Sequence, residues 1–270
     1  MQPKHRLNVH RWMAGAFIVL GMIGMPAMAQ PADSAVRAFK SCTQCHDETS
    51  KDPVLAITKT KHGVSADGRT PFADQACITC HGASTAHLED EGETPPLPDV
   101  TFKETDAKVG NAVCLTCHQS GSRMHWTGSK HENENLSCSS CHDTHVAHDP
   151  VLDKASQPLV CNNCHTQVRA DMLKPFRHPI REGKVTCSDC HNTHGSTAPS
   201  QLVKNNVVET CYQCHAEKRG PFLWEHQPVN DDCGICHKPH GSVTPAMLVT
   251  RGPWLCEQCH SASNHPSTAY

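Results

Sequence analysis

The stretch Cys187-Ser-Asp-Cys-His-Asn-Thr-His-Gly195 decides how this chain is organised, because its opening pattern recurs along the whole sequence. All eighteen cysteines of the 270 residues fall in nine Cys-x-x-Cys-His units. A secreted chain this rich in cysteine often has a disulfide scaffold, but here no cysteine lies outside the repeated unit. The nine units are Cys42, Cys45 and His46; Cys77, Cys80 and His81; Cys114, Cys117 and His118; Cys138, Cys141 and His142; Cys161, Cys164 and His165; Cys187, Cys190 and His191; Cys211, Cys214 and His215; Cys233, Cys236 and His237; and Cys256, Cys259 and His260.

The Cys-x-x-Cys-His unit is the attachment signature of c-type haem. Two thiols three positions apart lie on one face of a helical turn, where they can meet the two vinyl groups of one porphyrin. The adjacent histidine then lies under the iron as its proximal ligand. A zinc ribbon or a thioredoxin-like pair would explain one copy, but not nine copies that each carry this histidine. The sequence therefore predicts nine covalently attached haem c groups.

The motifs alternate between two kinds. First-kind motifs begin at Cys114, Cys161, Cys211 and Cys256, and second-kind motifs begin at Cys138, Cys187 and Cys233. Each second-kind motif carries another histidine three positions after the proximal one, and a further histidine precedes it by seven to nine residues. The repeat is a two-haem unit of about 47 residues. Residues 42–87 form a longer version of it.

The repeat also supplies candidates for the second axial ligand of each iron. Four full units and the opening of a fifth provide nine distal candidates, while His125 and His148 fall outside the pattern. Nine distal candidates for nine irons predict six-coordinate haems with two histidine ligands. A catalytic haem needs an open axial position, so we expect an electron carrier with no catalytic residue. The candidates are His62, His87, His131, His145, His178, His194, His226, His240 and His265.

The first 29 residues are typical of a secretory signal peptide. Lys4, Arg6 and Arg11 precede an apolar stretch over 13–25, and Ala27-Met28-Ala29 provides small residues at the expected cleavage site. A retained membrane anchor is the alternative, but the apolar stretch is shorter than the roughly 20 residues that span a bilayer. We expect a periplasmic protein, where haem is attached to cysteine.

The expected fold class is mostly irregular chain with short α-helices, an extended multihaem cytochrome c with little or no β-sheet. About 27 mature residues per haem and 4% aromatic residues cannot build an ordinary core. We expect three segments: the signal peptide (1–29), a first two-haem unit with an acidic, proline-rich linker (30–98), and further two-haem units, the fifth incomplete (99–270). Gly195 and Gly241 predict tight turns near a haem. No basic surface suggests a nucleic-acid partner.

These segments resemble the periplasmic decahaem cytochromes of outer-membrane electron conduits, the MtrA/DmsE family, over nearly all of the mature chain. The second-kind motifs with their flanking residues are far more specific than the haem motif alone. The residues that carry the resemblance are Cys138-Ser-Ser-Cys-His-Asp-Thr-His145, Cys187 to Gly195, Cys233-Gly-Ile-Cys-His-Lys-Pro-His-Gly241, Lys218-Arg-Gly-Pro-Phe-Leu-Trp-Glu-His226, His260-Ser-Ala-Ser-Asn-His-Pro-Ser267, Thr60-Lys-His-Gly63 and Arg69-Thr-Pro-Phe-Ala73.

The resemblance implies a role at the outer membrane. Members of this family sit inside a β-barrel porin and relay electrons between periplasmic donors, such as a quinol-oxidising cytochrome, and an extracellular multihaem cytochrome or reductase. It also implies ten haems, and extrapolating the repeat places a tenth motif about 20 to 30 residues after Cys256, beyond Tyr270. The alternatives are a free periplasmic electron shuttle and a nitrite- or hydroxylamine-type multihaem oxidoreductase.

Overall fold

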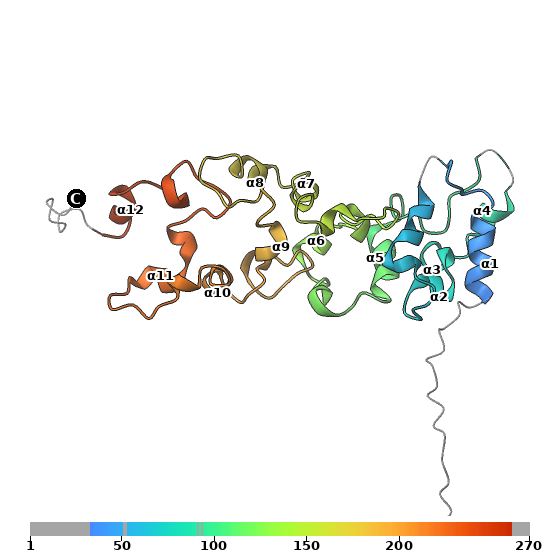
Figure 1. Cartoon of the computed structure of the whole chain (residues 1–270), viewed down its shortest axis with the longest axis horizontal. Coiled ribbons are helices and arrows are strands. Elements are labelled where there is room, and N and C mark those ends of the chain that lie inside the picture. The colour runs from blue at the N-terminus through green and yellow to red at the C-terminus, as the bar shows by residue number, and fades with distance from the viewer. Residues whose placement is uncertain (1–32, 51–52, 91, 93, 261–270) are drawn as a thin grey trace, which may run out of the picture.

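The structure, a computed structural model, describes residues 33–260 apart from 51–52, 91 and 93. The expected signal peptide and His265 lie outside the described residues. The molecule is elongated, and its helices follow one another along the long axis nearly in sequence order, from α1 at one end to α12 at the other (Figure 1). Neighbouring units of the repeat are therefore also neighbours in space.

The regular elements are short α-helices and 3-10 turns. They are α1 (Asp33–Cys42), η1 (Val54–Lys59), η2 (Lys61–Gly63), α2 (Pro71–Asp74), α3 (Cys77–His81), α4 (Thr85–Glu89), α5 (Ala107–Leu115), η3 (Gly121–Arg123), α6 (Lys130–Asn133), η4 (Cys138–Ser140), η5 (Pro150–Leu152), α7 (Gln157–Cys161), α8 (Thr166–Asp171), α9 (Cys187–Cys190), η6 (Pro199–Gln201), α10 (Val207–Cys211), η7 (Ala216–Lys218), α11 (Gln227–Asp231), η8 (Cys233–Ile235), η9 (Pro245–Met247) and α12 (Trp254–Glu257).

The two kinds of motif differ in where they lie on their own helices. First-kind motifs begin at or near a helix C-terminus, as Cys161 does in α7 and Cys211 in α10. Second-kind motifs begin a helical turn, as Cys187 does in α9 and Cys233 in η8. Side chains at the N-cap position start some of these helices, because they accept hydrogen bonds from otherwise unpaired amides. Asn206 caps α10 in this way.

Each two-haem unit brings its two motifs together by packing one helix against another. Contacts join α1 to α3, α5 to η4, α7 to α9, and α10 to η8. Buried or half-buried amide side chains reinforce two of these contacts. Asn111 of α5 donates to Leu136 O (3.0 Å) and accepts from the Cys138 amide (2.7 Å). Gln157 of α7 accepts from the Thr186 hydroxyl (2.7 Å) and the Ser188 amide (3.0 Å).

The expected fold class is confirmed, since the described residues contain short helices, irregular chain and no strand longer than an isolated bridge. Two of the bridges join equivalent residues of successive units, His191 with Leu202 and His237 with Leu248. Each closes the loop that follows a second-kind motif. The loop therefore recurs as a backbone structure and not only as a sequence pattern.

The apolar core is thin. Among the described residues, the one cluster of buried apolar side chains lies in the first unit, where Ala35, Phe72 and Ala76 pack together. Elsewhere large apolar side chains are exposed in the protein-only structure, such as Leu152 (74%), Leu159 (68%) and Trp224 (88%). Protein atoms alone thus leave much apolar surface uncovered, as expected if haem groups complete the interior.

Candidate haem sites

Thiols of successive motifs lie next to one another within each unit. The Cys42 thiol is hydrogen-bonded to the Cys77 thiol, which lowers the pKa of Cys42 to about 7 and raises that of Cys77. The same contact between first thiols recurs in three more units: Cys114 with Cys138, Cys161 with Cys187, and Cys211 with Cys233.

Second thiols connect one unit to the next. The pKa of Cys80 is raised by burial and by the nearby Cys117 thiol, and Cys164 and Cys214 act in the same way on Cys141 and Cys190. First thiols therefore contact each other within a unit, and second thiols lie near the thiols of the next unit. This alternation arranges the motifs from Cys42 to Cys233 as a single file in sequence order.

Three further second thiols, those of Cys45, Cys236 and Cys259, belong to the first motif and the last two. Cys45 and Cys259 are exposed, and Cys236 is half-buried. Each follows its first thiol in the same turn of backbone as the other motifs, with its amide donating to the carbonyl of the first cysteine at 3.2 to 3.4 Å. The local geometry predicted from the motif is therefore present at these three residues. The bond from each thiol to a haem vinyl group stays a prediction, as do the bonds from the other fifteen.

Eight of the nine proximal histidines face a second imidazole. In each pair the ring centres lie 5.9 to 6.2 Å apart. The pairs, proximal residue first, are His46–His87, His118–His62, His81–His145, His165–His131, His142–His194, His215–His178, His191–His240 and His260–His226.

This spacing leaves room for a metal ion between the rings. A transition metal binds an imidazole nitrogen at about 2 Å, and the ring centre lies about 1 Å beyond that nitrogen. Two imidazoles on opposite sides of one iron should therefore have ring centres about 6 Å apart. The observed distances match, so these pairs are suited to hold a haem iron by both axial positions.

The facing histidines come from different units. A second-kind proximal histidine faces the histidine three residues after the next second-kind proximal residue, as in His142–His194 and His191–His240. A first-kind proximal histidine faces the residue that precedes the second-kind motif of the preceding unit, as in His165–His131. His46–His87, within the first unit, departs from this rule. An iron in such a pair would connect neighbouring units.

Among the described residues, three histidines belong to none of these pairs: His125, His148 and His237. Within the described residues no second imidazole faces His237, and His265 lies outside those residues. His125 and His148, which the repeat leaves unassigned, are both exposed and face no proximal histidine in the part of the chain that the structure describes.

Hydrogen bonds orient several of the imidazoles. The Nδ1 atoms lie 2.6 to 2.8 Å from backbone carbonyl oxygens at six histidines: His81, His87, His131, His178, His191 and His237. A carbonyl only accepts, so Nδ1 carries the proton and Nε2 keeps its lone pair for a metal. The partner of His87 is Pro96, so the acidic linker is tied to a candidate site.

Burial also favours the neutral, metal-binding form of some histidines. It lowers the pKa of His118, His194 and His240, and the positive charge of Arg123 lowers the first two further. A neutral imidazole is the form that can bind iron, since protonation would occupy Nε2.

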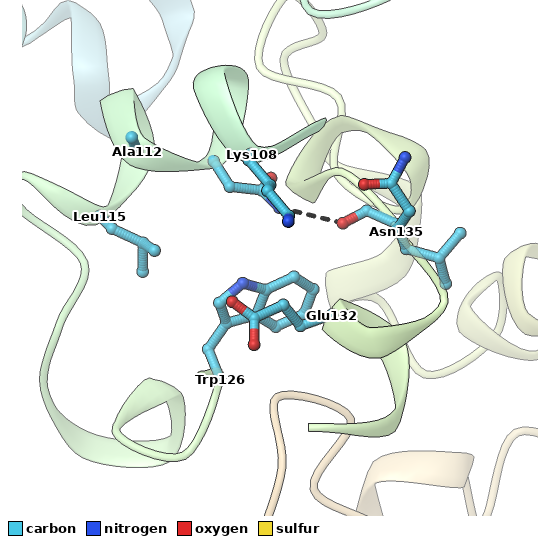
Figure 2. Close-up of a pocket in the computed structure, with 8 residues that line it drawn as sticks. Lys108, Ala112, Leu115, Trp126, Glu132 and Asn135 are labelled. Carbon is cyan, nitrogen blue, oxygen red and sulfur yellow. Dashed lines mark hydrogen bonds between the residues drawn. The ribbon is translucent and has the colours of Figure 1, made fainter. Parts of the chain in front are cut away.

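A pocket of about 220 Å³ lies between α5 and α6 beside the buried Trp126. Figure 2 shows the Trp126 indole next to Glu132, with Lys108 and Leu115 of α5 around it. The Trp126 ring lies 6.4 Å from that of His194. Among the described residues, Trp126 Nε1 and the nearby Arg123 Nε are buried without hydrogen-bond partners. Such donors fit a group with anionic substituents, as haem propionates are.

Two glycines let the distal histidines come close to the preceding unit. Gly195 follows His194 and Gly241 follows His240, with φ of +101° and +145°. A Cβ atom would collide with the His125 carbonyl oxygen at the first position and the Asp171 carbonyl oxygen at the second. The predicted tight turns are confirmed, and their purpose is close contact between units.

Asp149 is a residue of this region that the sequence did not suggest. Its Oδ2 lies 2.6 Å from Nδ1 of His142, where the equivalent histidines His191 and His237 bond to a backbone carbonyl. One signal was available in the sequence. Asp149 occupies the position seven residues after the proximal histidine, which is Ala198 or Thr244 in the following units.

Comparisons with known proteins agree with these sites. Residues 178–220 and 226–265 match a family described as "Doubled CXXCH motif", and residues 77–158 match one described as "Cytochrome c-type protein NrfB-like". Each doubled match begins at a predicted distal histidine, His178 or His226. A curated protein from Shewanella baltica, "Multiheme cytochrome MtrA", is 48% identical over 233 residues, which are 85% of this chain and 68% of that protein.

The chain belongs to the MtrA family of multihaem cytochromes. As a member of this family the chain carries covalently bound haem c, and its membership indicates an electron carrier. The family resemblance drawn from the sequence is thereby confirmed. No helix among the described residues is long and apolar enough to cross a membrane.

Proposed function

We propose that this chain holds nine haems in sequence order and passes electrons along them between periplasmic donors and acceptors at or beyond the outer membrane. The observation that carries the proposal is the order of the motifs, in which first thiols contact each other within units and second thiols lie near the thiols of the next unit. Haems bound in this order would lie close together along an elongated molecule (Figure 1).

The chain's own residues would keep each haem closed to exchangeable ligands. Haem would supply one-electron chemistry, the cysteines would hold the porphyrin, and the two facing imidazoles would bind the iron. Residues that hold the iron in this way would let electrons pass without any ligand being bound or released. This arrangement supports electron transfer and disfavours catalysis at the eight sites with paired histidines.

His265 remains a proposed distal ligand. Each of the other eight proximal histidines already faces an imidazole, so elimination alone assigns His265 to His237. The register seen at His142 and His191 would instead give His237 a histidine from a further second-kind motif. Optical and electron paramagnetic resonance spectra of the oxidised protein test this assignment. Nine low-spin haems are expected, and a His265→Ala variant should convert one of them to high spin.

We further propose that the chain works with an outer-membrane porin and an extracellular multihaem cytochrome or reductase, fed by a quinol-oxidising cytochrome. The relative's name and the family resemblance support this. A polar, irregular backbone cannot face lipid, so a crossing chain needs a protein sheath. The test is reconstitution with the candidate porin in liposomes. External reductant should reduce an internal acceptor, whereas liposomes with porin alone should show no such transfer.

The alternatives give different results in the same experiments. A free periplasmic shuttle would exchange electrons with soluble partners and would not fractionate with outer membranes. A nitrite- or hydroxylamine-type oxidoreductase would show at least one high-spin haem that binds substrate. The facing imidazoles at eight sites favour the relay over the enzyme.

A further inference from the structure

The second-kind motifs provide a comparison of equivalent sites within one chain. At His191 the Nδ1 atom bonds to the carbonyl of Ser200 (2.8 Å), and at His237 it bonds to that of Ala246 (2.8 Å). Both acceptors lie nine residues after the proximal histidine and adopt positive φ, 52° and 55°. Backbone geometry therefore provides a neutral acceptor at these two sites.

The hydrogen-bond acceptor for Nδ1 is of a different kind at His142. A carboxylate replaces the carbonyl, since Asp149 Oδ2 lies 2.6 Å from His142 Nδ1. Two backbone amides fix the carboxylate through Oδ1, those of Val151 (3.3 Å) and Asp143 (3.4 Å). The Asp149 side chain is only 13% exposed, so water screens its charge weakly.

A carboxylate hydrogen-bonded to Nδ1 changes how strongly the imidazole donates electrons to a metal. It draws the Nδ1 proton toward itself, which makes the ring a stronger electron donor through Nε2. Its negative charge also favours the more positive ferric site over the ferrous one. When the iron takes up one electron, the site loses one positive charge, and both effects oppose that step. Both therefore lower the reduction potential.

We propose that Asp149 is a redox-tuning residue that makes the haem at Cys138 and Cys141 the lowest-potential haem among the second-kind sites. The inference rests on the proposed binding of haem there, with His142 and His194 as axial ligands. Transfer of an electron onto this haem, from the neighbouring haem on either side, would then be unfavourable in free energy. Asp149 would set how unfavourable this transfer is, without favouring either direction of electron flow.

The experiment compares Asp149→Asn with the parent by potentiometric titration of the visible spectrum. Asn keeps the shape and can still accept a hydrogen bond, but it carries no charge. One of the one-electron components should move to higher potential, and at a fixed applied potential its reduced-to-oxidised ratio should rise about tenfold, or about 59 mV. The near-infrared charge-transfer band of one low-spin haem should move with it.

The matched control is Asp143→Asn, which removes a carboxylate one residue from His142. Asp143 Oδ1 accepts from the His145 amide (2.9 Å), and no hydrogen bond joins its carboxylate to the His142 ring. The shift in reduction potential caused by Asp143→Asn should be clearly smaller than that caused by Asp149→Asn. Asp149→Glu restores a carboxylate and should return the potential toward the parent. Superimposable titrations for Asp149→Asn and the parent, or equal shifts in both Asn variants, would overturn the proposal.

Haem mapping separates this inference from the proposed function. Mass spectrometry of the peptide that contains Cys138 and Cys141 shows whether haem is attached there. Its absence in the parent protein would contradict the proposed function. If haem is attached there but its reduction potential is the same in the parent and in Asp149→Asn, only the redox-tuning proposal is contradicted, and the proposed function is not. If the Asn variant loses its low-spin signal and Asp149→Ala shows no potential shift, Asp149 is only structural and the tuning proposal fails.

Discussion

The ring centre of His240 lies 6.1 Å from that of His191, although His240 is three residues from His237 in the same motif. The distal imidazole of one unit therefore faces the proximal imidazole of the unit before it. The same relationship joins His142 to His194. Iron bound in these pairs would join segments that share no local sequence, so haem attachment and the assembly of the repeat depend on each other.

This register predicts which haem loses its ligand in a His240→Ala variant. The haem proposed at Cys187 and Cys190 should become high-spin, because its iron would lose His240, the imidazole that faces His191. Electron paramagnetic resonance of the oxidised protein should show one high-spin haem, and the exposed His148→Ala variant should show none.

A second variant identifies the affected site. Adding Cys187→Ser and Cys190→Ser to His240→Ala removes that haem, so the high-spin signal should disappear. If the signal persists, His240 serves another iron and the register is wrong.

The relative orientation of the facing rings predicts two classes of low-spin signal. The rings of His62 and His118 are nearly perpendicular (89°), and those of His131 and His165 are close to this (73°). Perpendicular rings leave the two iron orbitals that they overlap nearly equal in energy, which produces a low-spin signal with a very large maximal g value. Near-parallel rings, such as those of His142 and His194 (10°), split these orbitals and produce rhombic spectra.

Low-temperature electron paramagnetic resonance should therefore resolve a minority of large-g haems beside a rhombic majority. His62→Ala should remove one large-g component and leave the rhombic signals unchanged. Spectra in which every haem is rhombic would contradict the ring geometry.

Gly241→Ala should destabilise the contact between neighbouring units. The new Cβ would meet the Asp171 carbonyl oxygen, and φ of +145° is unfavourable for any other residue. Backbone strain and overpacking together should cost about 2–5 kcal/mol. Denaturant unfolding followed at the Soret band should show a lower midpoint, with some high-spin haem as His240 moves.

Gly68→Ala is the control, since nothing lies within 4 Å of the added Cβ and its φ is not in the left-handed region. Its midpoint should stay within about 0.5 kcal/mol of the parent. Equal midpoints for both variants would show that close contact at Gly241 does not matter.

The chain without haem should not fold cooperatively. Its buried apolar cluster is confined to the first unit, around Phe72, and side chains such as Leu159 and Leu173 are exposed in the protein-only structure. Expression of residues 30–270 in the cytoplasm, without the predicted signal peptide and away from haem attachment, should yield a chain of low helicity that proteases digest rapidly. The exported, haem-loaded protein is the control. A cooperative thermal transition in the haem-free chain would contradict this expectation.

The candidate haem motifs could be predicted from the sequence because their chemistry is local. Two thiols three residues apart and the adjacent histidine lie within one helical turn, whatever surrounds them. In the structure the His191 amide donates to Cys187 O (2.9 Å), and equivalent bonds recur at seven other motifs. The short helices, and the lack of sheet in the part of the chain that the structure describes, were expected from the small number of residues per predicted haem. The repeat also predicted the set of distal candidates.

Only the tertiary structure decided which of these histidines face each other. His191 and His240 are 49 residues apart and belong to different motifs, so no local rule relates them. Along the sequence, His240 lies three residues from His237 and far from His191. Packing between units, with Gly241 against Asp171, brings His240 to His191 instead. The carboxylate of Asp149 likewise acquires its role through folding, because a turn returns it to His142.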